Sequence, residues 1–186
     1  MFVNECLYCG RPEEERMPVE QACYDFLDKL NLEYHRVDHE HAPSIEACHE
    51  VEKILGALIC KNLLLTNRQQ TEVYFLMMPG EKPFKTKLLA KQIGSTRLSF
   101  ATEEQMESLL GVTPGSLSVL ALMNDKEGKV KLVIDEDLLK DEFIGVHPCL
   151  NSSTVRLKTA DVVNIILPAV SHGFVTVSLP WVIEEE

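Results

Sequence analysis

The sequence predicts an α+β fold in which short strands and helices alternate within one domain. Segments whose apolar residues recur at helical spacing are separated by β-rich runs, and no internal repeat interrupts this order. A chain of 186 residues, 45% of them hydrophobic, is long enough for one buried core and short for two. We therefore expect a single domain at 18–179, preceded by an extension at 1–17 and followed by an acidic tail at 180–186.

Helices are expected where apolar residues recur every three or four positions. The stretch PVEQACYDFLDKLN at 18–31 has this spacing, with a proline in its first turn. A polar loop containing His39 and His41, both expected to be solvated, leads into the next helix, which ends near residue 55. Further helices are predicted at 87–93, at 103–110 with Thr102 as its cap and Gly111 as its stop, and at 159–167 with Thr159 as its cap.

Strands are expected where β-branched and aromatic residues form short apolar runs between turn residues. The run that contains Lys61 is followed by a turn at 66–70 and by TEVYFLMM at 71–78, so the two runs predict a hairpin. A turn at 124–128 likewise predicts antiparallel pairing between strands at 119–123 and 129–135. The remaining strands are expected at 32–37, near 98–100, at 154–157 and after 174.

The composition indicates a cytoplasmic protein without a membrane span. No apolar run approaches the roughly 20 residues that a spanning helix needs, and the first ten residues lack the layout of a secretory signal. The six cysteines are dispersed, which favours thiols over a disulfide framework. The segment CLYCG at 6–10 is half of a zinc knuckle without a second pair, so we expect no bound metal. The side chains that could still complete a site in space are His35, His39, His41, Cys48 and His49.

The net charge of −11 argues against broad nucleic-acid binding, which depends on cations that replace the counterions of phosphates. The charge is uneven, however, because acidic residues dominate 1–50 and basic residues dominate 81–97. Such a local basic face can bind one short piece of nucleic acid, or it can be an ordinary solvated helix face. The candidate phosphate contacts are Lys82, Lys85, Lys87, Lys91 and Arg97.

Lys61 and Asn62 stand inside the otherwise apolar run LGALICKNLLLT at 55–66. An ammonium removed from water costs several kcal/mol unless it is paired or solvated, so Lys61 must reach solvent or face a wet cavity. The alternative is a lysine that protects an edge strand from pairing with another chain.

Two further segments are candidates for chemistry. His147 lies in the turn-rich loop GVHPCLNSS, a setting that can hold an imidazole near a ligand or leave it on the surface. The turn GVTPGSLS at 111–118 can aim backbone N–H groups at an oxygen atom, or can simply be a turn. The sequence has no nucleophile elbow, Walker loop or dinucleotide fingerprint, which excludes most familiar enzyme classes.

Three ordered segments together carry a resemblance to a known family. These are CKNLLL around Lys61, RLSFATEEQMESLLGVTPGSLSVLAL at 97–122 and GVHPCLNSSTVRL at 145–157. With them, the chain resembles the YbaK and prolyl-tRNA-synthetase-associated aminoacyl-tRNA editing domains over about residues 18–167. The lysine followed by asparagine looks more like the freestanding alanyl-tRNA(Pro) deacylase branch, which includes PrdX-type proteins.

The resemblance implies a mixed, largely antiparallel and partly open barrel with flanking helices. It implies a trans-editing hydrolase that cleaves a wrong amino acid, alanine above all, from the terminal adenosine of tRNA(Pro), with the ribose hydroxyl assisting. It places Lys61, Asn62 and His147 in the catalytic pocket, and it places Gly111, Pro114, Gly115 and Ser118 in a substrate-binding loop. Lys61 would stabilise negative charge, and Asn62 would hold the ester carbonyl or the attacking water.

The expected partner is the acceptor end of aminoacylated tRNA(Pro), with prolyl-tRNA synthetase as a further candidate; neither DNA, nor a membrane, nor any cofactor is expected. Leu58, Met123 and Val146 lie next to the proposed segments and are candidate walls of a pocket that excludes proline by size. The acidic, cysteine-bearing N-terminus supports an alternative interpretation. In this interpretation the chain is a non-catalytic module that senses an amino acid or aminoacyl-tRNA for a partner protein.

Overall fold

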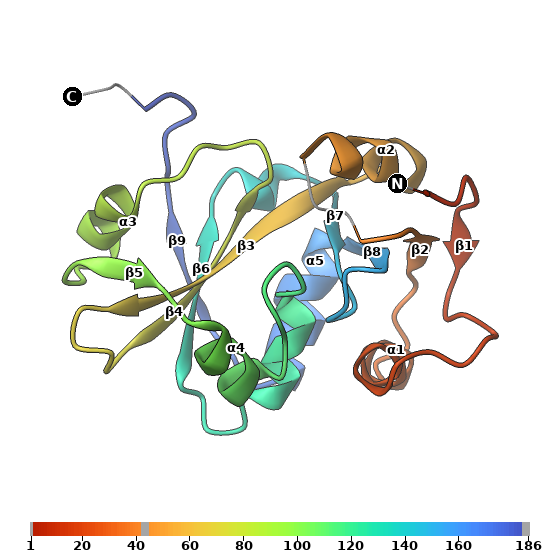
Figure 1. Ribbon diagram of the computed structural model, residues 1–186, viewed down its shortest axis with the longest axis horizontal. Coiled ribbons are helices and arrows are strands. Elements are labelled where there is room, and N and C mark those ends of the chain that lie inside the picture. The colour runs from red at the N-terminus through yellow and green to blue at the C-terminus, as the bar shows by residue number, and fades with distance from the viewer. Residues whose placement is uncertain (1, 42–44, 184–186) are drawn as a thin grey trace.

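The computed structural model describes residues 2–41 and 45–183, and within them it shows the predicted α+β fold (Figure 1). A mixed sheet of nine strands forms the centre, and the helices pack on its faces and ends. The strands are β1 (Tyr8–Cys9), β2 (His35–Asp38), β3 (Leu58–Asn67), β4 (Val73–Pro79), β5 (Leu98–Phe100), β6 (Val130–Asp135), β7 (Phe143–Val146), β8 (Ser153–Lys158) and β9 (Phe174–Val177). The α-helices are α1 (Pro18–Lys29), α2 (Ile45–Leu55), α3 (Thr86–Ile93), α4 (Glu103–Leu110), α5 (Thr159–Asp161) and α6 (Leu167–Ala169).

The sheet follows the order β1-β2-β8-β7-β3-β4-β6-β9, with β5 added to β3. The predicted hairpin is confirmed, since β3 and β4 pair antiparallel with Lys61 opposite Met78. Parallel pairs join β3 to β7, β4 to β6 and β6 to β9, and the other pairs are antiparallel. The order begins at β1 and ends at β9, and these two strands do not pair with each other among the described residues, so the sheet does not close into a full barrel.

The edge of β3 that faces away from β4 is only partly covered. On this edge β7 pairs with Leu58 and Ile59, and β5 pairs with residues 65–67. Between these two pairings, no strand of the described chain pairs with residues 60–63 on this edge. Lys61 and Asn62 therefore lie at a gap in the sheet, which is neither a fully paired interior strand nor a free outer edge.

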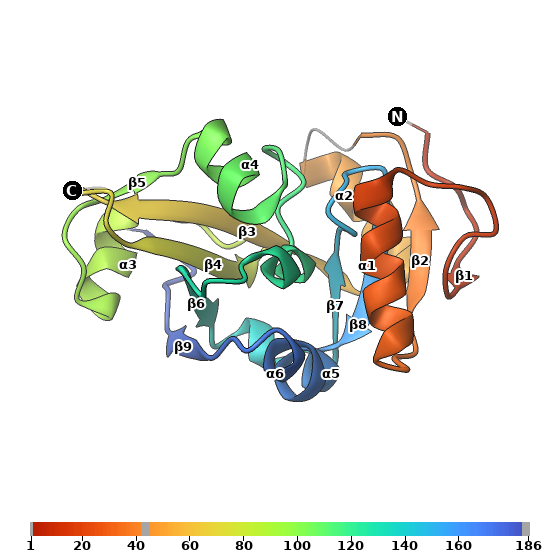
Figure 2. The same ribbon diagram turned by 90° about the horizontal axis from the view of Figure 1, so that it is seen from below.

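The helices form for the reasons that the sequence indicates. In α1, Pro18 occupies the first turn, where a missing N–H costs nothing, and Cys23, Tyr24 and Leu27 turn into the core. In α4, Thr102 forms a capping box with Gln105, and Gly111 ends the helix with φ 66°. Figure 2 shows α1 beside β2 and β8 at one end of the molecule and α3 at the other end, with α4 above β3.

Two predictions in the second half of the chain are wrong. Residues Val119–Asn124 form a 3₁₀-helix and not a strand, so β6 has no antiparallel partner there and pairs in parallel with β4 and β9. Thr159 is the first residue of the last helix and not its cap, because Lys158 occupies the cap position. The buried Thr159 hydroxyl has no hydrogen-bond partner among the residues that the structure describes. That helix continues through a π-helical stretch at Val162–Ile166 into α6.

The N-terminal residues pack on the sheet. β1 pairs with β2, a bridge joins Val3 to His39, and the Arg36 guanidinium donates to the carbonyl of Gly10 at 2.8 Å. All six cysteines are free thiols. Within the described residues, no helix has both the length and the apolar character needed to cross a membrane.

Candidate functional site

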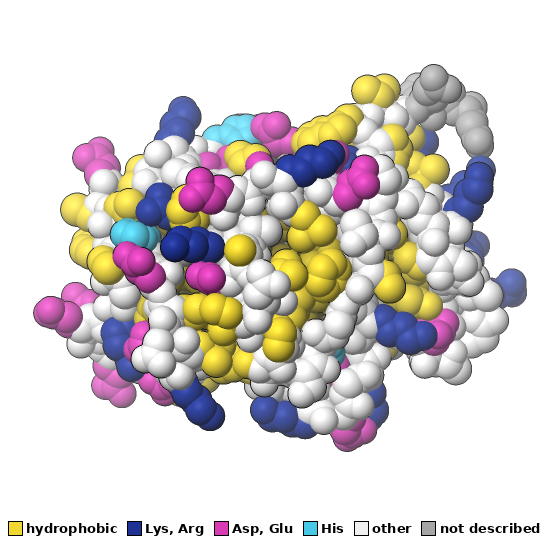
Figure 3. Space-filling view, turned by 180° about the vertical axis from the view of Figure 1, so that it is seen from behind, with side chains coloured by type: hydrophobic (Ala, Val, Ile, Leu, Met, Phe, Trp, Pro, Cys, Tyr) yellow, Lys and Arg dark blue, Asp and Glu magenta, His cyan; other side chains and the backbone are white. Residues whose placement is uncertain are grey.

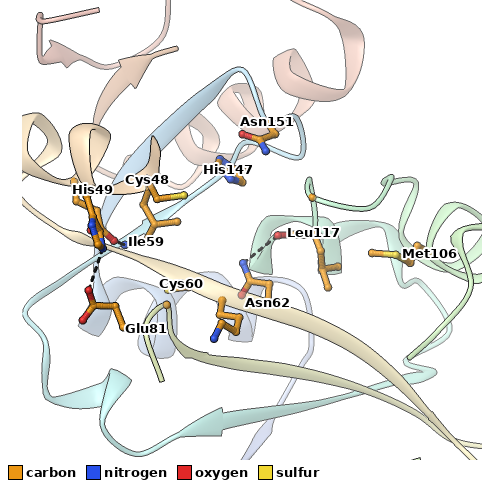
Figure 4. Close-up of a pocket in the computed structure, with 14 residues that line it drawn as sticks. Cys48, His49, Ile59, Cys60, Asn62, Glu81, Met106, Leu117, His147 and Asn151 are labelled. Carbon is orange, nitrogen blue, oxygen red and sulfur yellow. Dashed lines mark hydrogen bonds and ion pairs between the residues drawn. The ribbon is translucent and has the colours of Figure 1, made fainter. Parts of the chain in front are cut away.

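A cavity of about 290 Å³ lies at the gap in β3 (Figure 4). Four predicted site residues line it: Lys61 and Asn62 from β3, Gly115 from the loop after α4, and His147 from the loop after β7. The sequence did not place the other lining residues in this cavity. They are Cys48, His49 and Glu52 from α2, Ile59 and Cys60 from β3, Gly80 and Glu81 after β4, Met106 from α4, Leu117 from the loop after α4, and Asn151 from the loop after β7. The cavity is thus assembled from six separate segments of the chain.

Lys61 is half-buried, and its ammonium donates a hydrogen bond to the backbone carbonyl of Lys82 at 2.7 Å. Burial lowers the pKa of Lys61 from its ordinary value, because removal from water disfavours the charged form. No acidic side chain contacts this ammonium in the described part of the chain. The cation therefore keeps its charge available to a bound anion or oxyanion.

Asn62 leaves β3 on the face opposite to that of Lys61, as consecutive strand residues do. Its Nδ2 donates to the carbonyl of Leu117 at 3.0 Å, which ties the loop after α4 to the strand. Because a carbonyl can only accept, this contact identifies Nδ2, and the buried Oδ1 is left with no hydrogen-bond partner among the described residues. An unpaired buried acceptor beside a cavity is a place where a ligand donor can bind.

His147 is 8% exposed, and its Nδ1 lies 3.0 Å from the carbonyl of Ser153. A carbonyl only accepts, so Nδ1 carries the proton and Nε2 has the lone pair. Burial is the main cause that lowers the pKa of His147 to about 4. The imidazole is therefore neutral at physiological pH and presents an acceptor nitrogen.

A chain of hydrogen bonds holds His147 at the Nδ1 side of its ring. The Thr154 hydroxyl lies 3.3 Å from Nδ1 of His147 and 2.8 Å from Nε2 of His39, whose Nδ1 lies 2.7 Å from the carbonyl of Glu40. His39 is 5% exposed, so the prediction that it is solvated is wrong, whereas His41 is exposed as expected. Burial is also the largest cause that lowers the pKa of His39.

The loop at 111–118 divides into two parts. Gly115, with φ 84°, lines the cavity, and Pro114 is exposed beside it. Gly111 ends α4, and the buried Ser118 hydroxyl accepts from the N–H of Leu120 at the start of the 3₁₀-helix, so these two residues lie outside the cavity lining. The sequence indicates the loop as a whole and not which of its residues face the cavity.

Helix α2 contributes side chains that the sequence did not place in the pocket, although it named Cys48 and His49 as possible metal ligands. Glu52 accepts from the N–H of Ile59 at 2.8 Å, and burial raises the pKa of its carboxyl group. Nε2 of His49 lies 3.0 Å from a carboxylate oxygen of Glu81, and this contact links α2 to the turn after β4 (Figure 4). Cys48 and Glu52 are four positions apart and therefore share one helix face, a spacing that could have indicated them.

One predicted phosphate contact is corrected. Lys82 is 0% exposed, and its ammonium lies 2.8 Å from carboxylate oxygens of both Asp135 and Asp137. A cation enclosed in this way cannot reach a phosphate. The other four candidates have exposed side chains before, on and after α3, namely Lys85 at its N-cap, Lys87 and Lys91 within it, and Arg97 beyond it.

The predicted walls Leu58, Met123 and Val146 do not line the cavity. Leu58 is 48% exposed beside it, while Met123 and Val146 pack in the core. The neighbour of Leu58, Ile59, is the residue that faces inward. No cluster of three or more potential metal-binding side chains occurs in the chain as described.

Fold and cavity together define an α+β protein in which a cation, an amide and a neutral imidazole line one small cavity. The chain belongs to the aminoacyl-tRNA editing domain family, whose model matches residues 39–165, and its activity is aminoacyl-tRNA deacylation. It is 31% identical over 150 residues, 81% of this chain and 92% of the relative, to the prolyl-tRNA editing protein ProX of Acetoanaerobium sticklandii. It is 27% identical over 144 residues to the prolyl-tRNA synthetase associated domain-containing protein 1 of Danio rerio, covering 76% of this chain and 78% of that protein.

Solved structures show the same fold. A crystal structure provisionally assigned as a trans-editing enzyme for prolyl tRNA synthetase superposes with a TM-score of 0.66 at 17% identity, over 89% of this chain and 98% of that one. At this identity the likeness concerns the fold alone. It agrees with the mixed sheet and flanking helices described above.

Proposed function

We propose that this chain is a trans-editing enzyme that deacylates mischarged tRNA(Pro), and that alanine is the amino acid it removes. The proposal places the chain in the freestanding alanyl-tRNA(Pro) deacylase branch of its family. The observation that carries it is the convergence of Lys61, Asn62 and His147 on one cavity of about 290 Å³. The relatives named for prolyl-tRNA editing and for association with prolyl-tRNA synthetase support tRNA(Pro) as the carrier.

The three polar side chains suit the hydrolysis of an ester. Water adds to the ester carbonyl carbon, negative charge develops on the carbonyl oxygen, and the bond to the ribose oxygen then breaks to give a free amino acid and a ribose hydroxyl. The half-buried Lys61 ammonium stabilises the developing charge, which is worth more in a water-poor site than in bulk water. Preorganisation of such a charge commonly contributes several kcal/mol to the barrier.

Asn62 and His147 accept hydrogen bonds from the O–H groups that take part in the reaction. The free Oδ1 of Asn62 accepts a hydrogen bond, so this side chain orients the attacking water or a ribose hydroxyl and not the ester carbonyl. The Nε2 atom of neutral His147 accepts a second hydrogen bond, again from the attacking water or the ribose hydroxyl. These roles require no protein nucleophile, which agrees with the absence of a triad motif in the sequence.

A small cavity also explains why alanine is the amino acid removed. A synthetase pocket built for proline admits alanine, because the smaller side chain forfeits only about 1 to 3 kcal/mol of binding energy. A second site that admits alanine and excludes the proline ring supplies the missing discrimination. Ile59, Met106 and Leu117 provide the apolar surface of such a site here.

The test is deacylation of purified mischarged tRNA. The protein should hydrolyse alanyl-tRNA(Pro) faster than cysteinyl-tRNA(Pro) and faster than buffer, and Lys61→Ala should remove most of this rate. A matched control is Lys29→Ala, which removes an exposed lysine from α1. If neither ester is cleaved above background, or if the protein binds alanyl-tRNA(Pro) without turnover, the proposal fails.

A further inference from the structure

Lys82 lies in the turn between β4 and α3, and its side chain points into the protein. Its ammonium lies 2.8 Å and 2.9 Å from the two carboxylate oxygens of Asp135 and 2.8 Å from Oδ2 of Asp137. Its backbone N–H donates to the carbonyl of Pro79 at 3.1 Å, and its own carbonyl accepts from the Lys61 ammonium at 2.7 Å. One residue thus connects a buried ion pair to the cation of the cavity.

The turn is fixed at both ends. At Gly80, an added Cβ would lie only 2.7 Å from the carbonyl oxygen of Ile59, so the turn approaches β3 more closely than any other residue type allows. At Lys82, withdrawal of the ammonium from its buried site would leave the fully buried Asp135 carboxylate without its cation, which is strongly unfavourable, although Asp137 would keep Lys140 as a second partner. The Lys82 carbonyl, which accepts the hydrogen bond from the Lys61 ammonium, therefore has little freedom to move.

The carboxylates that hold Lys82 are themselves held by the C-terminal segment. Asp135 accepts from the N–H of Leu179 at 3.2 Å, and Asp137 accepts from the indole N–H of Trp181 at 2.7 Å. The Lys82 ammonium also lies 5.2 Å from the centre of the Trp181 ring. Figure 1 shows the chain running from β9 along this side of the sheet toward the C-terminus.

We infer that Lys82 is a positioning residue for Lys61: its ion pair with Asp135 and Asp137 fixes the carbonyl that aims the Lys61 ammonium into the cavity. The inference rests on the proposed function only in taking Lys61 as the group that acts on the ester. Without this anchor the turn relaxes, and the flexible Lys61 side chain turns toward bulk water. A displacement of about 1 Å in such a group costs on the order of 100-fold in rate.

Lys82→Met tests the anchor, and Asp137→Asn tests it more mildly, because Asp135 still pairs with Lys82 in that variant. The first readout is independent of activity: the pKa of Lys61, obtained from the pH dependence of its acetylation as measured by mass spectrometry of the Lys61 peptide. It should rise toward the ordinary lysine value in both variants, because the ammonium becomes more hydrated. The second readout is single-turnover deacylation, where the rate at saturation should fall by roughly 10- to 100-fold in Lys82→Met while KM changes little.

The single tryptophan, Trp181, contacts both Lys82 and Asp137, so chemical denaturation followed by circular dichroism, and not tryptophan fluorescence, reports whether each variant keeps its fold. Arg36→Met is the matched control, since it removes another buried cation, paired with Asp38 on β2, and should leave the pKa of Lys61 unchanged. An unchanged Lys61 pKa in both Lys82→Met and Asp137→Asn overturns the inference. A raised KM and a flatter salt dependence with an unchanged saturated rate also overturn it, because they would show that Lys82 binds phosphate. If the variants shift the pKa of Lys61 but the unmodified protein hydrolyses no aminoacyl-tRNA, the positioning role is upheld and the proposed function is refuted.

Discussion

The Nδ1 atom of His147 lies 3.0 Å from the carbonyl oxygen of Ser153, and this hydrogen bond determines which nitrogen of the ring remains for a ligand. The same strand residue also joins His147 to α1, because the Ser153 hydroxyl lies 3.0 Å from the buried carboxylate of Glu20 and 3.3 Å from the Tyr24 hydroxyl. The imidazole is therefore held by a fixed backbone group and surrounded by paired polar groups. Its orientation is set before any substrate binds.

This arrangement predicts a specific dependence of stability on pH. Burial lowers the pKa of His147 in the folded state to about 4, below the value near 6.5 of an unfolded chain. The unfolded state therefore binds the extra proton between these two values, and stability is lost as the pH falls from about 6.5 to about 4. The loss attributable to this residue is of the order of 3 kcal/mol.

Chemical denaturation of the protein and of His147→Gln at several pH values measures the effect. The variant should show a flatter stability curve between pH 6.5 and 4, although His39 retains part of the slope because burial lowers its pKa too. His41→Gln removes an exposed histidine and should follow the unmodified protein. Parallel curves for His147→Gln and the unmodified protein would show that the imidazole is not buried in its neutral form.

Gly80 should not tolerate even one methyl group. Its added Cβ would meet the backbone oxygen of Ile59 at 2.7 Å, and backbone cannot move aside as a side chain can. We expect Gly80→Ala to lower the free energy of unfolding by about 1 to 3 kcal/mol and to lower deacylation further, because the turn that holds Lys61 must shift. Gly173→Ala is the matched control, since nothing lies within 4 Å of its added Cβ. Equal stability of the two variants, measured by denaturation, would contradict the prediction.

Much of the site follows from the sequence because its residues come in recognisable segments. Lys61 and Asn62 are polar residues in an apolar strand, and the resemblance places His147 beside them although it lies far along the chain. The strand period, however, sends consecutive side chains to opposite faces, and both can border one cavity only because the sheet is open beside them. That gap is a property of the topology, which the sequence pattern does not contain.

The wrong predictions have a similar origin. Val119–Asn124 is almost wholly apolar and buried, and a short run of this kind has no period that separates a strand from a helical turn. Lys82 stands in a run of basic residues that predicts an exposed face, but its partners Asp135 and Asp137 lie more than 50 positions later. Charge patterns near a residue cannot indicate an ion pair that only the folded chain forms.

The exposed cations on and around α3 should bind the acceptor end of the tRNA. This helix directly follows the turn that borders the cavity, and Lys and Arg side chains follow the edge of the molecule where α3 lies (Figure 3). Replacing Lys85, Lys87 and Lys91 with glutamine should raise KM and leave the saturated single-turnover rate nearly unchanged. For every phosphate that is no longer neutralised, the log–log salt dependence should also become flatter by roughly 0.7 to 0.9.

The matched control for this face replaces three exposed lysines elsewhere, Lys29, Lys126 and Lys129, with glutamine. The two triple variants have the same net charge, so a general electrostatic effect would change both equally. An unaltered salt slope in the α3 variant would place the tRNA on another face of the molecule.

The size of the cavity should decide between alanine and proline. Both esters present the same carbonyl to Lys61, so discrimination must come from the apolar walls, of which Met106 on α4 is a buried member. Excess bulk in a packed wall costs about 1 to 3 kcal/mol, or roughly 5- to 150-fold in rate. Met106→Ala should therefore raise hydrolysis of prolyl-tRNA(Pro) relative to alanyl-tRNA(Pro) by up to that factor.

Met123→Ala provides a control of the same chemistry, because Met123 packs against the core without lining the cavity. Both variants remove the same side-chain atoms and should be less stable because of the void that remains, by about 2 to 5 kcal/mol at a fully buried site. Only Met106→Ala should change the ratio of the two rates, measured in single turnover at saturating protein and a temperature well below unfolding. If the unmodified protein already hydrolyses prolyl-tRNA(Pro) as fast as alanyl-tRNA(Pro), or if both methionine variants change the ratio equally, steric exclusion by this wall is not the basis of selection.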